Sequence, residues 1–281
     1  MTDQSMAFET SLEAQARLFC ERNAGSEQKA KRFLVLDLEY EYDRSRYDAY
    51  YVAEGRGAED SIRWAFHRVR AASWLPITFQ AGKAEVEFGK SVTLTADDHH
   101  ETEIVEAVFA QLDALPDAAV VTWGGECKDI PVLRRTAAEF GLVLPTSLRD
   151  LHPFARSRID LCNEVAGRAA NVHLPEYAAA TSIPAKPSPS KDIGELVCQG
   201  KWDLVEEQCR ADVLTTAIIL LRHLQSRAEI EVNMAQALEA LIAAASEAAP
   251  QSSFVDRTLR LWVKGIVARS KLRGLVPQMA A

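Results

Sequence analysis

The sequence lacks the features that mark several large classes of protein. Its five cysteines are scattered and form no CxxC pair, which argues against a disulfide framework. No secretory signal is recognisable, so we expect reduced thiols in a cytoplasmic protein. No apolar run is long enough to span a bilayer.

An excess of positive charge is also missing. The formal net charge is −8, with 40 acidic residues against 32 lysines and arginines. Bulk electrostatics therefore does not attract nucleic acid, and any role on nucleic acid depends on metal ions or a local basic patch. The sequence shows no glycine-rich phosphate loop, no G-x-S-x-G elbow and no histidine spacing typical of a metal site.

The most informative stretch is residues 33–40, which read Phe-Leu-Val-Leu-Asp-Leu-Glu-Tyr. A short apolar run of this kind is typical of a buried strand. Side chains alternate between the faces of a strand, so Asp37 and Glu39 share one side and Leu38 takes the other. Two neighbouring carboxylates repel each other unless a cation lies between them, which favours a metal site. The alternative is a strand end that frays into an acidic loop.

The rest of the chain predicts an α/β protein with strands first and helices last. After the strand at 33–39 we expect a charged, tyrosine-rich loop over 40–64, a hairpin of strands 69–79 and 84–94, a helix that begins near residue 97, and a strand at 118–123. Further helices are expected at 130–140, 161–167, 174–181, 193–199, 202–224, 228–248 and 254–271, with an irregular segment over 142–159 and an N-terminal helix before residue 25. This order favours a mixed β-sheet flanked by helices, with the first strand central. We expect an N-terminal helical extension (1–31), one α/β domain (32–225) and a C-terminal helical extension (226–281).

Two further acids stand where such a site could use them. Asp129 follows the strand at 118–123 and a Gly-Gly pair, and an N-cap role for the next helix is the alternative. Asp212 precedes an apolar run inside a long helix, and a salt bridge to an arginine is the alternative. With Asp37 and Glu39 these acids could hold two magnesium or manganese ions roughly 3.5–4 Å apart, because hard divalent cations prefer oxygen ligands.

Three segments carry a recognisable pattern in order. The first is Asp-Leu-Glu at 37–39, the second is Thr-Trp-Gly-Gly-Glu-Cys-Lys-Asp-Ile-Pro-Val-Leu at 122–133, and the third is Gln-Cys-Arg-Ala-Asp-Val-Leu-Thr-Thr at 208–216. They resemble the motifs of the DEDD 3′–5′ exonucleases, which read DxE, N-G-x-x-F-D-x-P-x-L and Y-x-x-x-D-V-x-x-T. Within that group the chain resembles the stand-alone predicted exonucleases related to the proofreading domains of family B DNA polymerases. Residues 174–186, which end in Ile-Pro-Ala-Lys, are similar as well, so the resemblance covers about residues 32–225.

The resemblance implies a ribonuclease H-like fold and a two-metal site. The implied ligands of the two Mg²⁺ or Mn²⁺ ions are Asp37, Glu39, Asp129 and Asp212. The family usually has a water-orienting tyrosine at the position of Gln208, which can orient a water by hydrogen bonding but is not a useful base. In a subtype with histidine one residue earlier, the matching residue is Glu207, which points about 100° away around the helix.

The resemblance also implies contacts to the substrate near the metals. These are expected at Leu38, Trp123, Gly124, Gly125 and Lys186. Trp123 could instead pack in the core, and Lys186 could instead lie on a mobile, solvated loop. Two positions of the second motif depart from the family, with Gly124 in place of asparagine and Lys128 in place of an aromatic residue.

We therefore expect a metal-dependent exonuclease that removes nucleotides from the 3′ end of single-stranded DNA, with RNA as the less favoured substrate. The alternative is a weak or inactive member that acts as a nucleic-acid- or protein-binding module. No membrane is expected as a partner, and the sequence does not decide between a monomer and a homodimer. The basic helix after residue 254 could grip nucleic acid, but we favour packing on the domain with a solvated basic face.

Overall fold

The structure, a computed structural model, describes residues 30–55, 63–83, 85–152, 155–186 and 192–273. The strands are β1 (Lys31–Tyr42), β2 (His67–Phe79), β3 (Val86–Phe88), β4 (Val92–Thr95), β5 (Ala119–Thr122) and β6 (Arg158–Asp160). The α-helices are α2 (Arg44–Glu54), α3 (Glu101–Ala114), α4 (Asp129–Phe140), α5 (Thr146–Arg149), α6 (Leu161–Ala166), α7 (Leu174–Ala180), α8 (Ile193–Cys198), α9 (Trp202–Ser226), α10 (Met234–Ala248) and α11 (Arg260–Arg273). The helix expected before residue 25 lies outside the described residues.

These strands form one mixed sheet with β1 at its centre, as predicted. The strand order is β3-β2-β1-β5-β6, and β4 also pairs with β2. β1 pairs antiparallel with β2 and parallel with β5, and β5 pairs parallel with β6. The carboxyl ends of three neighbouring parallel strands therefore lie at one edge of the sheet, where catalytic groups of α/β proteins commonly gather.

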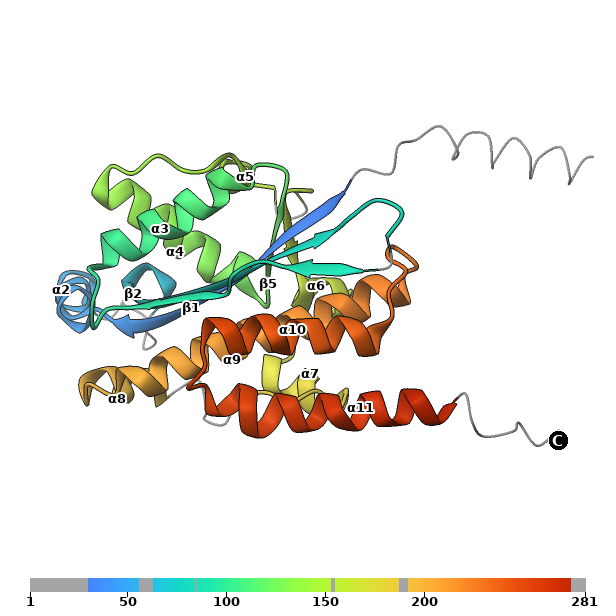
Figure 1. The fold of residues 1–281 in the computed structure, drawn as a ribbon. Coiled ribbons are helices and arrows are strands. Elements are labelled where there is room, and N and C mark those ends of the chain that lie inside the picture. The colour runs from blue at the N-terminus through green and yellow to red at the C-terminus, as the bar shows by residue number, and fades with distance from the viewer. Residues whose placement is uncertain (1–29, 56–62, 84, 153–154, 187–191, 274–281) are drawn as a thin grey trace, which may run out of the picture.

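The side chains of β1 divide the molecule into two hydrophobic layers. Leu34, Leu36 and Leu38 pack with α3 and α4 on one face, whereas Phe33 and Val35 pack with α9, α10 and α11 on the other. Figure 1 shows the two helical layers on opposite sides of the sheet. The alternation continues through residues 37 and 39, so both acids face the layer that contains α9.

Helix α9 is the central element of that layer. Every residue from Gln208 to Leu221 is buried, and the helix contacts β1, β2 and β4. A helix that is covered on all sides excludes water from any polar group along it. A carboxylate such as Asp212 in this stretch therefore needs a compensating partner.

The prediction of a tyrosine-rich loop over 40–64 is wrong for residues 44–54, because these form helix α2. Asp43 caps the helix by accepting a hydrogen bond from the backbone N–H of Arg46 at 3.1 Å. The helix buries no residue, so no apolar periodicity marks it in the sequence. Its ring contacts instead join Tyr47 and Tyr50 to Phe66.

Three other boundaries also differ from the prediction. The second hairpin strand is split into β3 and β4, and between them lies Gly89, where an added Cβ would lie 2.9 Å from Pro76. Helix α3 begins at Glu101 rather than near residue 97, since His100 and Glu103 form a capping box there. The segment 142–159 was expected to be irregular, but it contains α5 and the start of the short edge strand β6.

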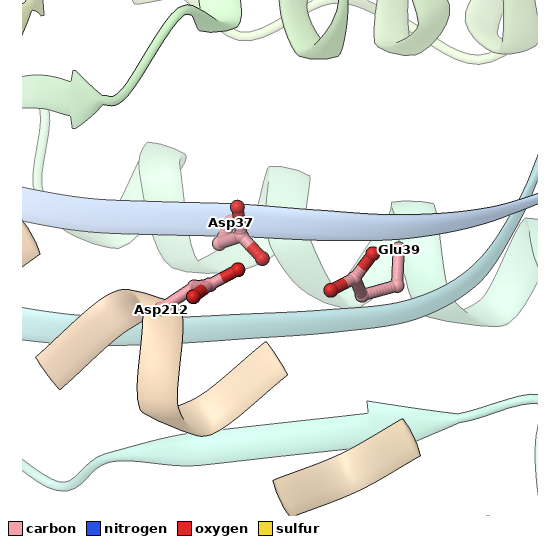
Figure 2. Close-up of side chains that lie close together, drawn as sticks. All are labelled: Asp37, Glu39 and Asp212. Carbon is pink, nitrogen blue, oxygen red and sulfur yellow. The ribbon is translucent and has the colours of Figure 1, made fainter. Parts of the chain in front are cut away.

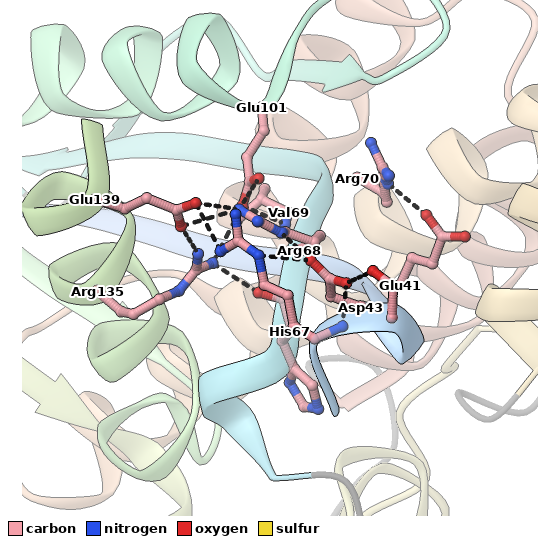
Figure 3. A network of polar contacts seen from close by, with 11 residues as sticks. Glu41, Asp43, His67, Arg68, Val69, Arg70, Glu101, Arg135 and Glu139 are labelled. Atoms are coloured by element: carbon pink, nitrogen blue, oxygen red, sulfur yellow. Dashed lines mark hydrogen bonds and ion pairs between the residues drawn. The ribbon is translucent and has the colours of Figure 1, made fainter. Parts of the chain in front are cut away.

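A network of ion pairs fastens the layer of α3 and α4 to the sheet (Figure 3). Arg68 on β2 contacts Asp43 at 3.0 Å, Glu101 at 3.1 Å and Glu139 at 2.9 Å. Arg135 on α4 joins the same acids, with Glu101 at 3.2 Å and Glu139 in close contact. The network links β2, α3, α4 and the start of α2, and it fixes the helix whose first residue is Asp129.

No helix within the described ranges is both long enough and apolar enough to cross a lipid bilayer.

Candidate metal centre

Three of the four predicted ligands converge on one point. Asp37 and Glu39 come from β1 and Asp212 comes from α9, and one ligand oxygen of each lies within 4.8 Å of the others. Figure 2 shows the three carboxylates directed toward one another across the gap between the strand and the helix. Glu39 and Asp212 are buried, and Asp37 is half-buried. The geometry follows from the alternation of β1 and from the packing of α9 on the same face.

The carboxylates of this group destabilise one another when ionised. Burial raises the pKa of Asp37 well above its usual value, and the charges of Asp212, Glu39 and Asp129 add to this. Burial likewise raises the pKa of Glu39 to about 7 and raises the pKa of Asp212. A group of acids with raised pKa values is the arrangement that a bound cation would relieve.

Lys186 enters the same group from the loop after α7. Its Nζ donates to Oδ2 of Asp212 at 2.5 Å and to Oε1 of Glu39 at 3.3 Å. The side chain is only 2% exposed, so it is not the solvated loop residue of the alternative prediction. The two carboxylates raise the pKa of Lys186 against the opposing effect of burial, so the amine is charged. The partner of Asp212 is thus a lysine and not an arginine.

Asp129 lies beside the three converging carboxylates rather than among them. It is the first residue of α4, whose cap residue is Lys128, so it does not fill the N-cap role. One carboxylate oxygen accepts a hydrogen bond from the Tyr40 hydroxyl at 2.6 Å. Burial raises the pKa of Asp129, and its charge contributes to the raised pKa of Asp37. The four predicted acids therefore interact electrostatically, and one oxygen of Asp129 is engaged by the Tyr40 hydroxyl.

The loop between β5 and α4 has a tightly determined backbone. Gly124 adopts φ +73°, which favours glycine, and its N–H donates to Oδ1 of Asp160 at 2.8 Å. At Gly125 an added Cβ would lie 2.4 Å from the hydroxyl oxygen of Thr122. Trp123 is half-buried, and its indole N–H donates to the carbonyl of Val172 at 3.1 Å. This backbone sets the position of Asp129, four residues after Gly125.

Two predicted site residues have surroundings that limit their roles. The Leu38 side chain is buried in the layer of α3 and α4, on the face of β1 opposite the acids, so only its backbone is available near the site. Gln208 is 2% exposed, and neither atom of its amide has a hydrogen-bond partner within the described ranges. It lies one turn before Asp212 on the same side of α9. An unpaired buried amide is costly and is expected to bind a water or a ligand.

Glu207 forms its hydrogen bonds with residues outside the carboxylate group. Its carboxylate accepts from the backbone N–H of Phe254 at 2.6 Å and from the Ser253 hydroxyl at 3.1 Å. It also pairs with Arg210 at 3.1 Å. These contacts hold Glu207 at the turn before α11, so it is not positioned as a base for the carboxylate group.

Tyr40 and Asp160 contact predicted site residues but were not predicted from the sequence themselves. Tyr40 directly follows the Asp-Leu-Glu motif, and its buried hydroxyl could have been assigned a nearby acid as partner. Asp160 accepts from the N–H groups of Gly124 and Glu126, and burial raises its pKa. No local pattern points to this role, because Asp160 comes from a strand that was not expected.

The donor set suits a hard divalent cation. All three converging side chains offer carboxylate oxygens, which magnesium and manganese prefer. The Oδ1 atom of Asp212 is buried and has no hydrogen-bond partner among the described residues, which is unfavourable for a carboxylate without a cation. The residues present therefore fit the metal that the sequence implies.

Comparison with known proteins identifies the family. Residues 59–262 match a family described as predicted 3′-5′ exonucleases related to the exonuclease domain of PolB. Asp129 and Asp212 lie inside the matched segment, and the strand that carries Asp37 and Glu39 precedes it. No curated protein matches the chain.

The solved structures to which the chain is similar include a DNA polymerase and an exonuclease. One is the family B DNA polymerase from the hyperthermophilic archaeon Pyrobaculum calidifontis, with 14% identity, a TM-score of 0.46, and coverage of 77% of this chain and 29% of the polymerase. The other is product-bound exonuclease I, with 14% identity, a TM-score of 0.41, and coverage of 72% of this chain and 45% of that protein. The chain thus spans less than half of the length of either protein. The mixed six-stranded sheet flanked by helices is the α/β architecture that the sequence predicts. From the family match over 59–262, the chain belongs to the predicted 3′-5′ exonucleases related to the exonuclease domain of PolB.

Proposed function

We propose that this protein is a metal-dependent 3′–5′ exonuclease that hydrolyses phosphodiester bonds at the 3′ end of DNA, with RNA as the less favoured substrate. The observation that carries the proposal is the convergence of Asp37, Glu39 and Asp212 within 4.8 Å of one another. Residues 32–225 would form the exonuclease domain, and residues 226–281 would add helices to one face of it.

The site would hold two divalent cations, Mg²⁺ or Mn²⁺. Asp37, Glu39 and Asp212 would bind one ion, and Asp37 with Asp129 would hold the other. When bound, such a pair supplies activation of water and stabilisation of charge on the entering and leaving oxygens. The chain's part is to hold the carboxylates in a buried place, where charges act strongly.

Gln208 is the residue we assign to orienting the attacking water. Its amide is buried and unpaired in the described part of the chain, and it lies one turn from Asp212. It can donate to or accept from a water but cannot remove the proton. Because Glu207 is held by Phe254 and Ser253, neither residue supplies a side-chain base, and we expect slow turnover.

The loop from Trp123 to Gly125 and the backbone of Leu38 would line the path of the 3′-terminal nucleotide. At Gly124 an added Cβ would meet open space, and the Trp123 ring packs against Tyr177 with the ring centroids 5.0 Å apart. Lys186 would contact the phosphate once the site is loaded.

The test is hydrolysis of a single-stranded DNA oligonucleotide labelled at its 5′ end, with manganese and then with magnesium. We expect a ladder that shortens from the 3′ end and is lost in Asp212→Asn, which keeps the shape of the side chain. Asp203→Asn, an exposed acid at the start of the same helix, is the matched control and should cleave like the wild type. Equal cleavage by wild type and Asp212→Asn would refute the assignment.

A binding module with a weak or silent site is the second candidate. The observation that favours it is that neither Glu207 nor Gln208 offers the carboxylate group a side chain that can accept a proton from the attacking water. This candidate predicts metal-dependent binding of the oligonucleotide without shortening of it, so the same gel separates the two functions.

A further inference from the structure

The position of Lys186 bears on how the proposed metal site is loaded. Its ammonium nitrogen lies 2.5 Å from an oxygen of Asp212 and 3.3 Å from an oxygen of Glu39. These are two of the three residues that would bind one divalent ion, and the oxygens that a metal would use lie within 4.8 Å of one another. Because Lys186 bridges two of these three carboxylates, its ammonium and a divalent ion bound there would repel each other at close range.

The segment that carries Lys186 is fastened along α9 and α11. The carbonyl of Pro184 accepts from the Thr215 hydroxyl at 3.0 Å, and Thr215 lies one turn after Asp212. The carbonyl of Ser182 accepts from the indole N–H of Trp262 at 2.8 Å, and Ile183 between them is buried. Ser182 adopts φ +55°, which is unusual for a residue other than glycine. The contacts on both sides of Ile183 direct the chain so that Lys186 reaches the carboxylates.

The balance of charge in the site also opposes binding of two divalent cations while Lys186 stays in contact with the carboxylates. The four acids carry four negative charges when ionised, which two divalent cations balance. With Lys186 in place, the same two cations would bring five positive charges against four. The lysine is therefore a surplus charge in the fully loaded site, and the phosphodiester of a bound strand would supply the anion that it then needs.

We infer that Lys186 competes with the metal for Glu39 and Asp212. In the metal-free protein its ammonium group neutralises these two carboxylates and holds them together. It must leave them when the first divalent ion binds. This inference rests on the proposed function, since it concerns the same metal site. It gives the C-terminal helix a role as well, because Trp262 supports the segment that presents the lysine.

The test is titration of the full chain with Mn²⁺ in the absence of substrate. Electron paramagnetic resonance measures the concentration of free Mn²⁺ at each step. Lys186→Met removes the charge and keeps the length of the side chain, and we expect it to bind the first Mn²⁺ at least about tenfold more tightly than the wild type. Lys186→Arg keeps the charge and should stay near the wild-type affinity. Lys201→Met is the matched control, because Lys201 is exposed and lies about 16 Å before Asp212 along the helix.

A second variant keeps the inference testable if Lys186→Met does not fold. Trp262→Phe removes the hydrogen bond to Ser182 and loosens the segment, and it should raise the Mn²⁺ affinity in the same direction by a smaller factor. Affinities of Lys186→Met and Trp262→Phe equal to those of the wild type and Lys201→Met would overturn the inference but leave the metal site intact. Binding of Mn²⁺ by none of the proteins would overturn both the inference and the proposed metal site.

Discussion

The hydrogen bond between Tyr40 and Asp129 is the contact whose removal has the most clearly defined consequence. Tyr40→Phe deletes one oxygen atom and leaves the ring in place. Both side chains are buried, and the bond is 2.6 Å long. A hydrogen bond to a charged group contributes about 1.5–3 kcal/mol to stability. We therefore expect Tyr40→Phe to lower the free energy of unfolding by about 2 kcal/mol, or Tm by roughly 4–8 °C for a chain of this size.

The loss should depend on pH in a known direction. Burial raises the pKa of Asp129, and the Lys128 ammonium and the Tyr40 hydroxyl oppose that rise. Without the hydroxyl the pKa of Asp129 in the folded protein rises further. The ionised carboxylate is then more costly to bury, so the variant loses most at pH 8, and the loss shrinks as the pH falls through the raised pKa and the carboxyl takes up a proton.

The assay is urea unfolding of wild type and Tyr40→Phe in the presence of a chelator, at pH 8 and at pH 5. Tyr42→Phe is the matched control, because Tyr42 lies on the same strand with a half-exposed ring and should change stability little at either pH. Equal stability of Tyr40→Phe and wild type at pH 8 would refute the reasoning, and so would a larger loss at pH 5 than at pH 8.

Two further predictions concern the loop and the carboxylates. Gly125→Ala should lower the free energy of unfolding by about 1–3 kcal/mol, because its Cβ would overlap buried Thr122. The control is Gly265→Ala, where the added Cβ meets open space, and it should be neutral or slightly stabilising in thermal unfolding. Equal effects of the two changes would contradict this prediction. Stabilisation by Mn²⁺, measured as the difference in Tm with and without the metal at each pH, should grow from pH 5.5 to pH 8. The raised pKa values, about 7 for Glu39, leave the carboxylates partly protonated at the lower pH, where protons compete with the metal; a difference that is constant or falls with pH would show that other groups bind the ion.

The periodic parts of the fold were predictable from the sequence. The alternation of residues 33–39 placed Asp37 and Glu39 on one face of a central strand, and the structure confirms this arrangement. The long helix around Asp212 was expected within two residues of its observed ends, because its apolar face is continuous. These features are local, so a single segment contains the information for each.

The parts that could not be predicted depend on contacts between distant segments. Helix α2 buries none of its residues, so it has no apolar face to recognise. Lys186 contacts Glu39, which lies 147 positions away in the sequence, and Tyr40 contacts Asp129, which lies 89 positions away. Two of the partners of Glu207, Ser253 and Phe254, lie 46 and 47 residues away. Sequence patterns show which groups need a partner, but only the packing of α9 and α4 on the sheet decides which partner they meet.

The central claim is that Asp37, Glu39 and Asp212 bind a divalent cation together. The measurement that tests it most directly is anomalous X-ray diffraction from crystals of the full chain soaked in manganese. We expect an anomalous peak within coordination distance of oxygens from all three side chains, with the Lys186 nitrogen displaced from Glu39 and Asp212. Absence of a peak there, while the lysine remains on both carboxylates at saturating manganese, would contradict it.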